Sequence, residues 1–140
     1  MSRVVNTNSP GKRRHYHMRS CAELLRHLSQ KQDIDAEACD MLGALVFSLQ
    51  AIDDTLQEAI DAWEKRDYWM KAEQFRQEWA WVSANMDHLV AILREEDWAT
   101  IPTVLARLFP HFQEITINKN MRSPDLWNGK YEKFQQEFVH

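Results

Sequence analysis

Between Ala44 and Ile101 the chain contains neither glycine nor proline. Most β-proteins need turn residues about every ten positions, and this interval has none. Apolar residues instead recur in alternating steps of four and three, which places them on one side of an α-helix. One such repeat comprises Ala38, Leu42, Leu45, Leu49, Ile52, Leu56, Ala59 and Trp63, and a second comprises Tyr68, Ala72, Phe75, Trp79, Val82, Met86, Leu89 and Leu93. The sequence therefore predicts an all-α protein.

The two apolar repeats are out of phase, and the slip falls in the polar segment 64–67. We interpret it as a turn between two antiparallel helices, at about residues 35–64 and 67–95, each roughly 45 Å long at about 1.5 Å per residue. One bent helix spanning both repeats is the alternative. A hairpin is expected to bury the apolar side of both helices, including Leu45, Leu49, Leu56, Phe75, Trp79 and Leu89.

Shorter helices are predicted on both sides of this hairpin. Residues 1–14 are polar and basic and are expected to form an extended arm. Ser20 and Glu23 have the spacing of a capping box for a first helix, with a start near His15 as the alternative.

The C-terminal part of the chain carries two further helix signals. Asp97 and Thr100 precede a helix that has Pro102 in its first turn. The segment 123–125, Ser-Pro-Asp, is a typical N-terminal signature for a last helix. The complete prediction is an up-down bundle of four to five helices, in which residues 15–140 form a single domain.

Charges are strongly segregated along the chain. Residues 1–31 contain seven Lys/Arg and one acid, whereas residues 32–64 contain nine acids and no Lys/Arg. On the helix predicted at 35–64, acids lie opposite the apolar repeat, namely Asp40, Asp54, Glu58 and Asp61. Phe47 lies in the middle of this acidic face, close to the small residues Gly43 and Ala36. A plain acidic face is solvated, but one that also carries a ring and small residues indicates a groove for another segment.

The oppositely charged N-terminal arm is the expected occupant of this groove, from the same chain or from a sister subunit. Its basic residues are Lys12, Arg13, Arg14 and Arg19. We expect Arg13, Arg14 or Arg19 to contact Asp40, Asp54 or Glu58, and we expect Tyr16 or Met18 to cover Phe47.

Six of the 19 residues from Trp63 to Trp81 are aromatic, and they include four of the six tryptophans. This density indicates an aromatic core or a surface that binds a partner. Trp69 and Trp81 fall roughly 120° to either side of the apolar repeat, so they either pack on the first and last helices or face a partner. The candidate interaction residues are Phe47, Trp69, Arg76, Trp81 and Trp127. Their surplus apolar surface predicts at least a dimer.

The basic arm is also a candidate for binding nucleic acid. The segment 9–12, Ser-Pro-Gly-Lys, resembles short elements of basic tails that enter the minor groove. A few basic contacts give only salt-sensitive, non-specific affinity.

Catalytic, cofactor and metal sites are not predicted. His27 and His88 lack the glutamate three residues earlier that a di-iron helical bundle uses. Phosphate loops and nucleophile elbows are missing from the sequence. No apolar run approaches the ~18 residues of a membrane span, and Cys21 and Cys39 have no disulfide or metal spacing, as in a reducing cytoplasm.

The pattern Trp63-Glu-Lys-Arg-x-Tyr-Trp69, followed by Phe75-Arg-x-Glu-Trp-x-Trp81, resembles a group of small uncharacterised bacterial helical proteins. The segment from Asn6 to Lys12 is also similar to an N-terminal element of that group. The resemblance implies a bacterial cytoplasmic protein and supplies no activity. The sequence predicts a non-enzymatic module that self-associates and binds a protein partner through its aromatic surface and basic arm. A nucleic-acid-associated accessory protein is the alternative, and a helical-bundle enzyme is the third hypothesis.

Overall fold

The structure is a computed structural model that describes residues 9–117 and 122–139. Within these residues the chain forms six α-helices and no strand: α1 (Pro10–Ser29), α2 (Ala36–Lys65), α3 (Trp69–Glu78), α4 (Ala80–Glu95), α5 (Ile101–Leu108) and α6 (Lys130–Phe138). Three short 3₁₀ turns join them: η1 (Trp98–Thr100), η2 (Phe109–Phe112) and η3 (Pro124–Leu126). The all-α prediction is confirmed.

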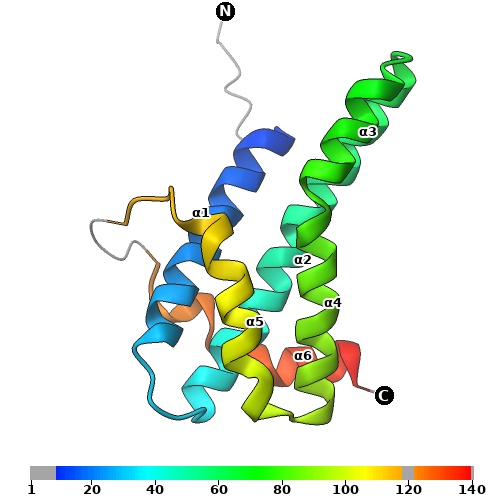
Figure 1. The fold of residues 1–140 in the computed structure, drawn as a ribbon. Coiled ribbons are helices and arrows are strands. Elements are labelled where there is room, and N and C mark those ends of the chain that lie inside the picture. The colour runs from blue at the N-terminus through cyan, green and yellow to red at the C-terminus, as the bar shows by residue number, and fades with distance from the viewer. Residues whose placement is uncertain (1–8, 118–121, 140) are drawn as a thin grey trace, which may run out of the picture.

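The predicted antiparallel hairpin forms the spine of the molecule, with α2 as one arm and α3 with α4 as the other (Figure 1). Helices α5 and α6 pack against the end of the hairpin farthest from the turn, α1 packs along α2, and the turn end projects (Figure 1). The apolar repeats supply the buried core, including Leu45, Leu49, Leu56, Val82 and Leu89. Phe75 and Trp79 are half-buried rather than fully buried.

The hairpin turn is closed by hydrogen bonds of the backbone. The Tyr68 amide donates to the Trp63 carbonyl at 2.9 Å, and the Asp67 amide donates to the Glu64 carbonyl at 3.0 Å. This pair of bonds is the Schellman arrangement, which requires a left-handed residue after the helix. Asp67 adopts it with φ of 62°. The turn is therefore a defined structure that fixes the direction in which the following side chains project.

The second arm of the hairpin is interrupted at Trp79, where one continuous helix was predicted. Trp79 has φ of −108° and ψ of 9°, and its carbonyl accepts from the Val82 amide in a tighter 3₁₀ bond. The ring of Trp79 lies 6.1 Å from that of Phe75 and 5.8 Å from that of Trp81. The helical ladder thus breaks within a run of packed rings.

The prediction of an extended arm through residue 14 is wrong, because α1 already begins at Pro10. The Ser9 side chain accepts a hydrogen bond from the Lys12 amide, and proline favours the first helical turn. Residues 1–8 of the predicted arm lie outside the described residues. The capping-box prediction also fails, since Ser20 and Glu23 are buried in the middle of α1.

The last helix starts six residues later than its signature suggests. Ser123 does cap a turn, its side chain accepting from the Asp125 amide, but that turn is the short η3. Gly129, with φ of 77°, separates η3 from α6. Trp127 consequently precedes α6 and does not lie on its apolar face.

Candidate interaction surface

The acidic face of α2 is a groove for another segment, as predicted, but its occupant is α6. The two Asp40 carboxylate oxygens accept from the Gly129 amide at 3.2 Å and the Tyr131 amide at 3.0 Å, which satisfies amides at the start of α6. The ring of Phe47 lies 6.0 Å from that of Phe138, and the Lys133 ammonium lies 4.5 Å from the centre of the Phe47 ring. The expectation that the arm covers Phe47 is therefore wrong.

The basic residues of α1 contact a part of α2 nearer the turn. Arg13 forms an ion pair with Glu58 at 2.6 Å, which confirms one of the predicted charge contacts. Arg14 donates to the Thr55 hydroxyl at 3.1 Å, and its guanidinium lies over the rings of Phe75 at 5.1 Å and Trp79 at 5.5 Å. Burial in this position lowers the pKa of Arg14 from its ordinary value.

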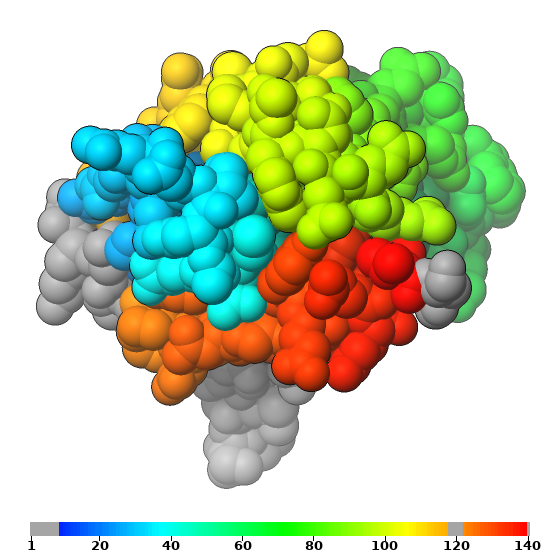
Figure 2. All heavy atoms as spheres, turned by 90° about the horizontal axis from the view of Figure 1, so that it is seen from below, coloured from blue at the N-terminus to red at the C-terminus, as the bar shows by residue number. Residues whose placement is uncertain are grey.

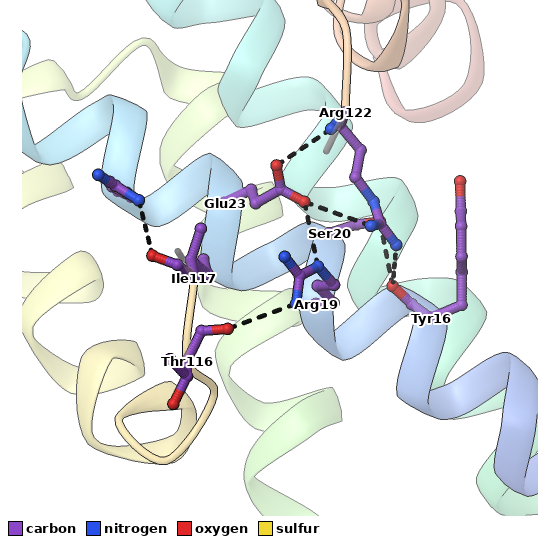
Figure 3. A network of polar contacts seen from close by, with 8 residues as sticks. Tyr16, Arg19, Ser20, Glu23, Thr116, Ile117 and Arg122 are labelled. Atoms are coloured by element: carbon purple, nitrogen blue, oxygen red, sulfur yellow. Dashed lines mark hydrogen bonds and ion pairs between the residues drawn. The ribbon is translucent and has the colours of Figure 1, made fainter. Parts of the chain in front are cut away.

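A network of polar contacts ties α1 to the connector that follows η2 (Figure 3). The Glu23 side chain is 1% exposed. Its Oε1 accepts from the Arg122 amide at 3.1 Å, and its Oε2 lies 3.3 Å from Nη1 of Arg122. The Arg122 guanidinium also donates to the Ser20 hydroxyl and the Tyr16 carbonyl, each at 3.1 Å. Arg19 donates to the Thr116 carbonyl at 3.4 Å.

These contacts hold parts of the chain together. They also lower the number of cations that remain available to bind the phosphate backbone of a nucleic acid. Of the four basic residues predicted for the arm, Arg13, Arg14 and Arg19 bind groups of this chain. Lys12 is exposed on α1. Affinity for nucleic acid scales with the number of phosphates that a protein neutralises, so intramolecular use of three cations weakens the nucleic-acid alternative.

Four of the six aromatic side chains from Trp63 to Trp81 are half-buried and pack against one another, while Tyr68 and Trp69 are exposed. The rings of Trp63, Phe75, Trp79, Trp81 and His111 follow one another at centroid distances of 4.8, 6.1, 5.8 and 3.9 Å. We call this row the aromatic ladder. Trp81 stacks nearly parallel to His111 and meets the edge of Phe112 in η2. Trp81 thus joins the hairpin to the rest of the bundle while it stays half-buried, and its role as an interaction residue stays a prediction.

Trp127 is buried, and its ring lies 5.1 Å from that of His27 in α1. Its prediction as an interaction residue is wrong, because its side chain is not exposed to a partner. Phe134, on α6, is fully buried. The surplus apolar surface expected from the sequence is thus largely covered within one chain.

Among the described residues, a run of exposed apolar side chains lies at the hairpin turn, while Tyr16, Phe109 and Val139 are exposed elsewhere. Tyr68, Trp69 and Met70 are consecutive and are 48%, 58% and 88% exposed. We call these three residues the hairpin tip; they extend beyond the main body of the bundle at the turn end (Figure 1). Exposed cations border them, namely Lys65, Arg66 and Lys71. Among the aromatic candidate interaction residues, Trp69 is the one that is exposed.

The base of the hairpin tip is held in place by contacts between α2 and α3. Arg76 forms ion pairs with Glu64 of α2 at 3.0 Å and with Glu73 of α3 at 2.6 Å. The Trp63 and Phe75 rings meet edge to face at 4.8 Å directly below the turn. Arg76, a predicted interaction residue, therefore supports the hairpin tip. The remaining predicted acids, Asp54 and Asp61, are exposed on α2.

A second apolar surface lies at the opposite end of the bundle, and it was not predicted from the sequence. It is a groove of about 580 Å³ between the end of α1 and α5. Its apolar lining comprises Leu28, Ile34, Trp98, Leu105, Ala106 and Phe109. We call it the α1–α5 groove. No local pattern marks it, because its walls come from the α1–α2 connection, η1 and α5, which are about 65 residues apart along the chain.

Acids are frequent in the two connections beside the α1–α5 groove, and its lining holds one acid, Asp33, and one cation, Lys31. Residues 30–37 and 95–97, the connections on either side, contain six acids and one cation, Lys31. Lys31 lies 3.0 Å from a carboxylate oxygen of Asp35 and 2.6 Å from one of Glu37. The Ala38 amide and Lys31 lower the pKa of Asp35, and Lys31 lowers that of Glu37, so both carboxylates are charged at neutral pH.

Comparison with known proteins does not supply a function. The chain matches no protein-family model, no curated protein and no solved structure. In residues 9–117 and 122–139, no group of three or more His, Cys, Asp or Glu side chains is arranged to hold a metal ion. No helix in the same residues is long and apolar enough to cross a membrane. The resemblance to small bacterial proteins stays a prediction.

Proposed function

We propose that the protein is a non-catalytic helical assembly module that self-associates through its hairpin tip. The observation that carries this proposal is the exposure of three consecutive large side chains, Tyr68, Trp69 and Met70, on a projecting and rigid turn. Tryptophan, tyrosine and methionine are enriched in the centres of protein interfaces.

The turn is also preorganised for binding. The backbone bonds at Asp67 and Tyr68, and the ion pairs of Arg76 with Glu64 and Glu73, already fix the position of the tip before any partner arrives. Binding then loses less conformational entropy than it does for a mobile loop. Solubility does not favour three consecutive exposed apolar side chains, so their exposure indicates an interaction site.

Sedimentation equilibrium tests the proposal with a double substitution, Trp69→Ala with Met70→Ala. Both side chains are mostly exposed, and alanine favours α3, so the variant should keep its helix content by circular dichroism. The wild type should show a mass above 16.6 kDa that rises with concentration over about 1–300 µM, a range that spans the affinities of small interfaces. The variant should remain a monomer.

A matched control is Gln74→Ala with Gln77→Ala, two exposed positions of α3 away from the tip. This control should assemble as the wild type does. A wild type that stays at 16.6 kDa over the whole range, or a tip variant that assembles equally well, would overturn the proposed function. A low-salt shift of DNA or RNA by such a monomer, lost on substitution of Lys12, would instead favour the nucleic-acid alternative.

A further inference from the structure

The hairpin tip and the α1–α5 groove differ in shape and in the charge of the segments that carry them. The hairpin tip is convex, and the segment 65–71 that carries it contains three cations and one acid. The α1–α5 groove is concave, and the connections beside it, residues 30–37 and 95–97, contain six acids and one cation. One surface is thus an apolar projection on a net basic segment, and the other is an apolar recess between net acidic connections.

The size of the recess suits the projection. A volume of about 580 Å³ lies within the range of pockets that enclose ligand-sized groups, about 300–1,000 Å³. The side chains of Trp69 and Met70 together form a group of ligand size that such a groove can enclose. Trp98 and Phe109, which line the groove, provide aromatic surface for an indole or a thioether.

We propose that the α1–α5 groove is the docking site for the hairpin tip of a second copy of this chain, so that copies join head to tail. In this arrangement Trp69 and Met70 enter the groove, and Lys65, Arg66 and Lys71 face its acidic border. The inference rests on the proposed function, because it names the surface that the hairpin tip binds.

The positions of the two surfaces decide which kind of assembly results. The hairpin tip lies at one end of the spine, and the α1–α2 and α4–α5 connections lie at the other (Figure 1). Viewed from that other end, the two connections lie side by side (Figure 2). An interface between two different surfaces is heterologous, so it leaves one free tip and one free groove on every pair. Growth therefore continues to rings or filaments.

Pairing of two hairpin tips is disfavoured by the same charges. It would bring two copies of the net basic segment 65–71, each with three cations and one acid, together around an apolar contact, and like net charges within a Debye length of about 8 Å repel. Pairing of two grooves would leave both recesses without a projection to fill them. Charge and shape therefore favour the head-to-tail contact.

Two variants that block different surfaces provide the test. Trp69→Ala with Met70→Ala removes the projection, and Ala106→Arg places a bulky cation in the groove on the exposed side of α5. Ala84→Arg, at an exposed position of α4 outside both surfaces, is the matched control for the arginine. Circular dichroism and thermal melts establish that all variants are folded.

Each blocked variant should be a monomer by sedimentation velocity, with self-association weakened about tenfold or more, as for the loss of an interface anchor. An equimolar mixture of the two should form a dimer and nothing larger, because only one intact tip and one intact groove remain. Ala84→Arg should assemble as the wild type does.

The outcomes separate this inference from the proposed function. If the wild type does not associate, both are wrong. If it associates and requires the tip, but Ala106→Arg assembles normally or the mixture stays monomeric, the proposed function stands and the groove is not the docking site. If the wild type stops at a dimer that the tip variant cannot form, tips pair with tips and the head-to-tail inference is overturned.

Discussion

Replacing Gly43 with alanine should loosen α6 from α2. A β-carbon on Gly43 would lie 2.6 Å from the carbonyl oxygen of Lys130 and 2.8 Å from its carbonyl carbon. Both atoms belong to the backbone at the start of α6, so no side-chain rotation relieves the contact. The helix must move away from α2, and that movement stretches the bonds that the Gly129 and Tyr131 amides donate to Asp40.

The expected free-energy change combines three terms. Overpacking costs about 1–3 kcal/mol, and a weakened hydrogen bond to a charged group loses part of about 1.5–3 kcal/mol. Alanine returns about 1 kcal/mol through its higher helix propensity in α2. The net result should be a loss of about 1–3 kcal/mol in the free energy of unfolding.

Urea unfolding followed by circular dichroism measures this change. Gly11→Ala is the matched control, because nothing lies within 4 Å of a β-carbon at Gly11 in the first turn of α1. That control should gain about 0.4–1 kcal/mol, the usual effect of removing a glycine from a compatible position. The reasoning is refuted if Gly43→Ala is as stable as the wild type or more so, since α6 would then not lie against α2 at this point.

Three further substitutions test the core and the polar network. Leu49→Ala removes a fully buried side chain of the spine and should cost about 2–5 kcal/mol in urea unfolding; a cost below 1 kcal/mol would contradict the burial. Arg122→Met removes the ion pair of its guanidinium with the buried Glu23 carboxylate at 3.3 Å but keeps the bond from its backbone amide and the approach of Arg19 at 3.7 Å. The cost should therefore fall near the low end of the roughly 3–5 kcal/mol that breaking a buried pair costs, while the exposed Arg107→Met should change little. Burial, with the charges of Arg122 and Arg13, lowers the pKa of His17, so the unfolded chain takes up this proton more readily. The stability that neutral His17 contributes is complete above its ordinary pKa of about 6.5 and is lost as pH falls below that value. The free energy of unfolding of His17→Gln should therefore depend less steeply on pH between about pH 7 and 5.5. A pH dependence equal to that of the wild type would refute this assignment.

The spine of the fold could be predicted because it depends on local periodicity. The repeat from Ala38 to Trp63 marks the buried side of α2, and the phase slip at residues 64–67 locates the turn. The interruption at Trp79 could not be predicted, because it occurs where the ring packs against Phe75 and Trp81. Ring packing of this kind depends on tertiary contacts that a helical repeat does not encode.

The groove on α2 was predicted, but its occupant was not. Gly43, Phe47 and Asp40 indicate that a segment lies on this face, yet they do not specify which one. Charge favoured the basic segment, whereas the contacts made by α6 are backbone approach, ring packing and helix capping. Of the aromatic candidate interaction residues, Trp69 alone is exposed, because Trp81 and Trp127 pack against residues distant in the sequence, His111 and His27.

The oxidation of Met70 by dilute peroxide, followed by mass spectrometry at increasing protein concentration, tests the central claim most directly. Met70 is 88% exposed in the isolated chain, and buried Met41 supplies the slow internal reference. The account predicts that Met70 oxidises fast in dilute protein and slows as the sedimenting mass rises, because assembly covers the hairpin tip. A Met70 rate that stays constant while the mass rises, or a protein that never assembles, would contradict it.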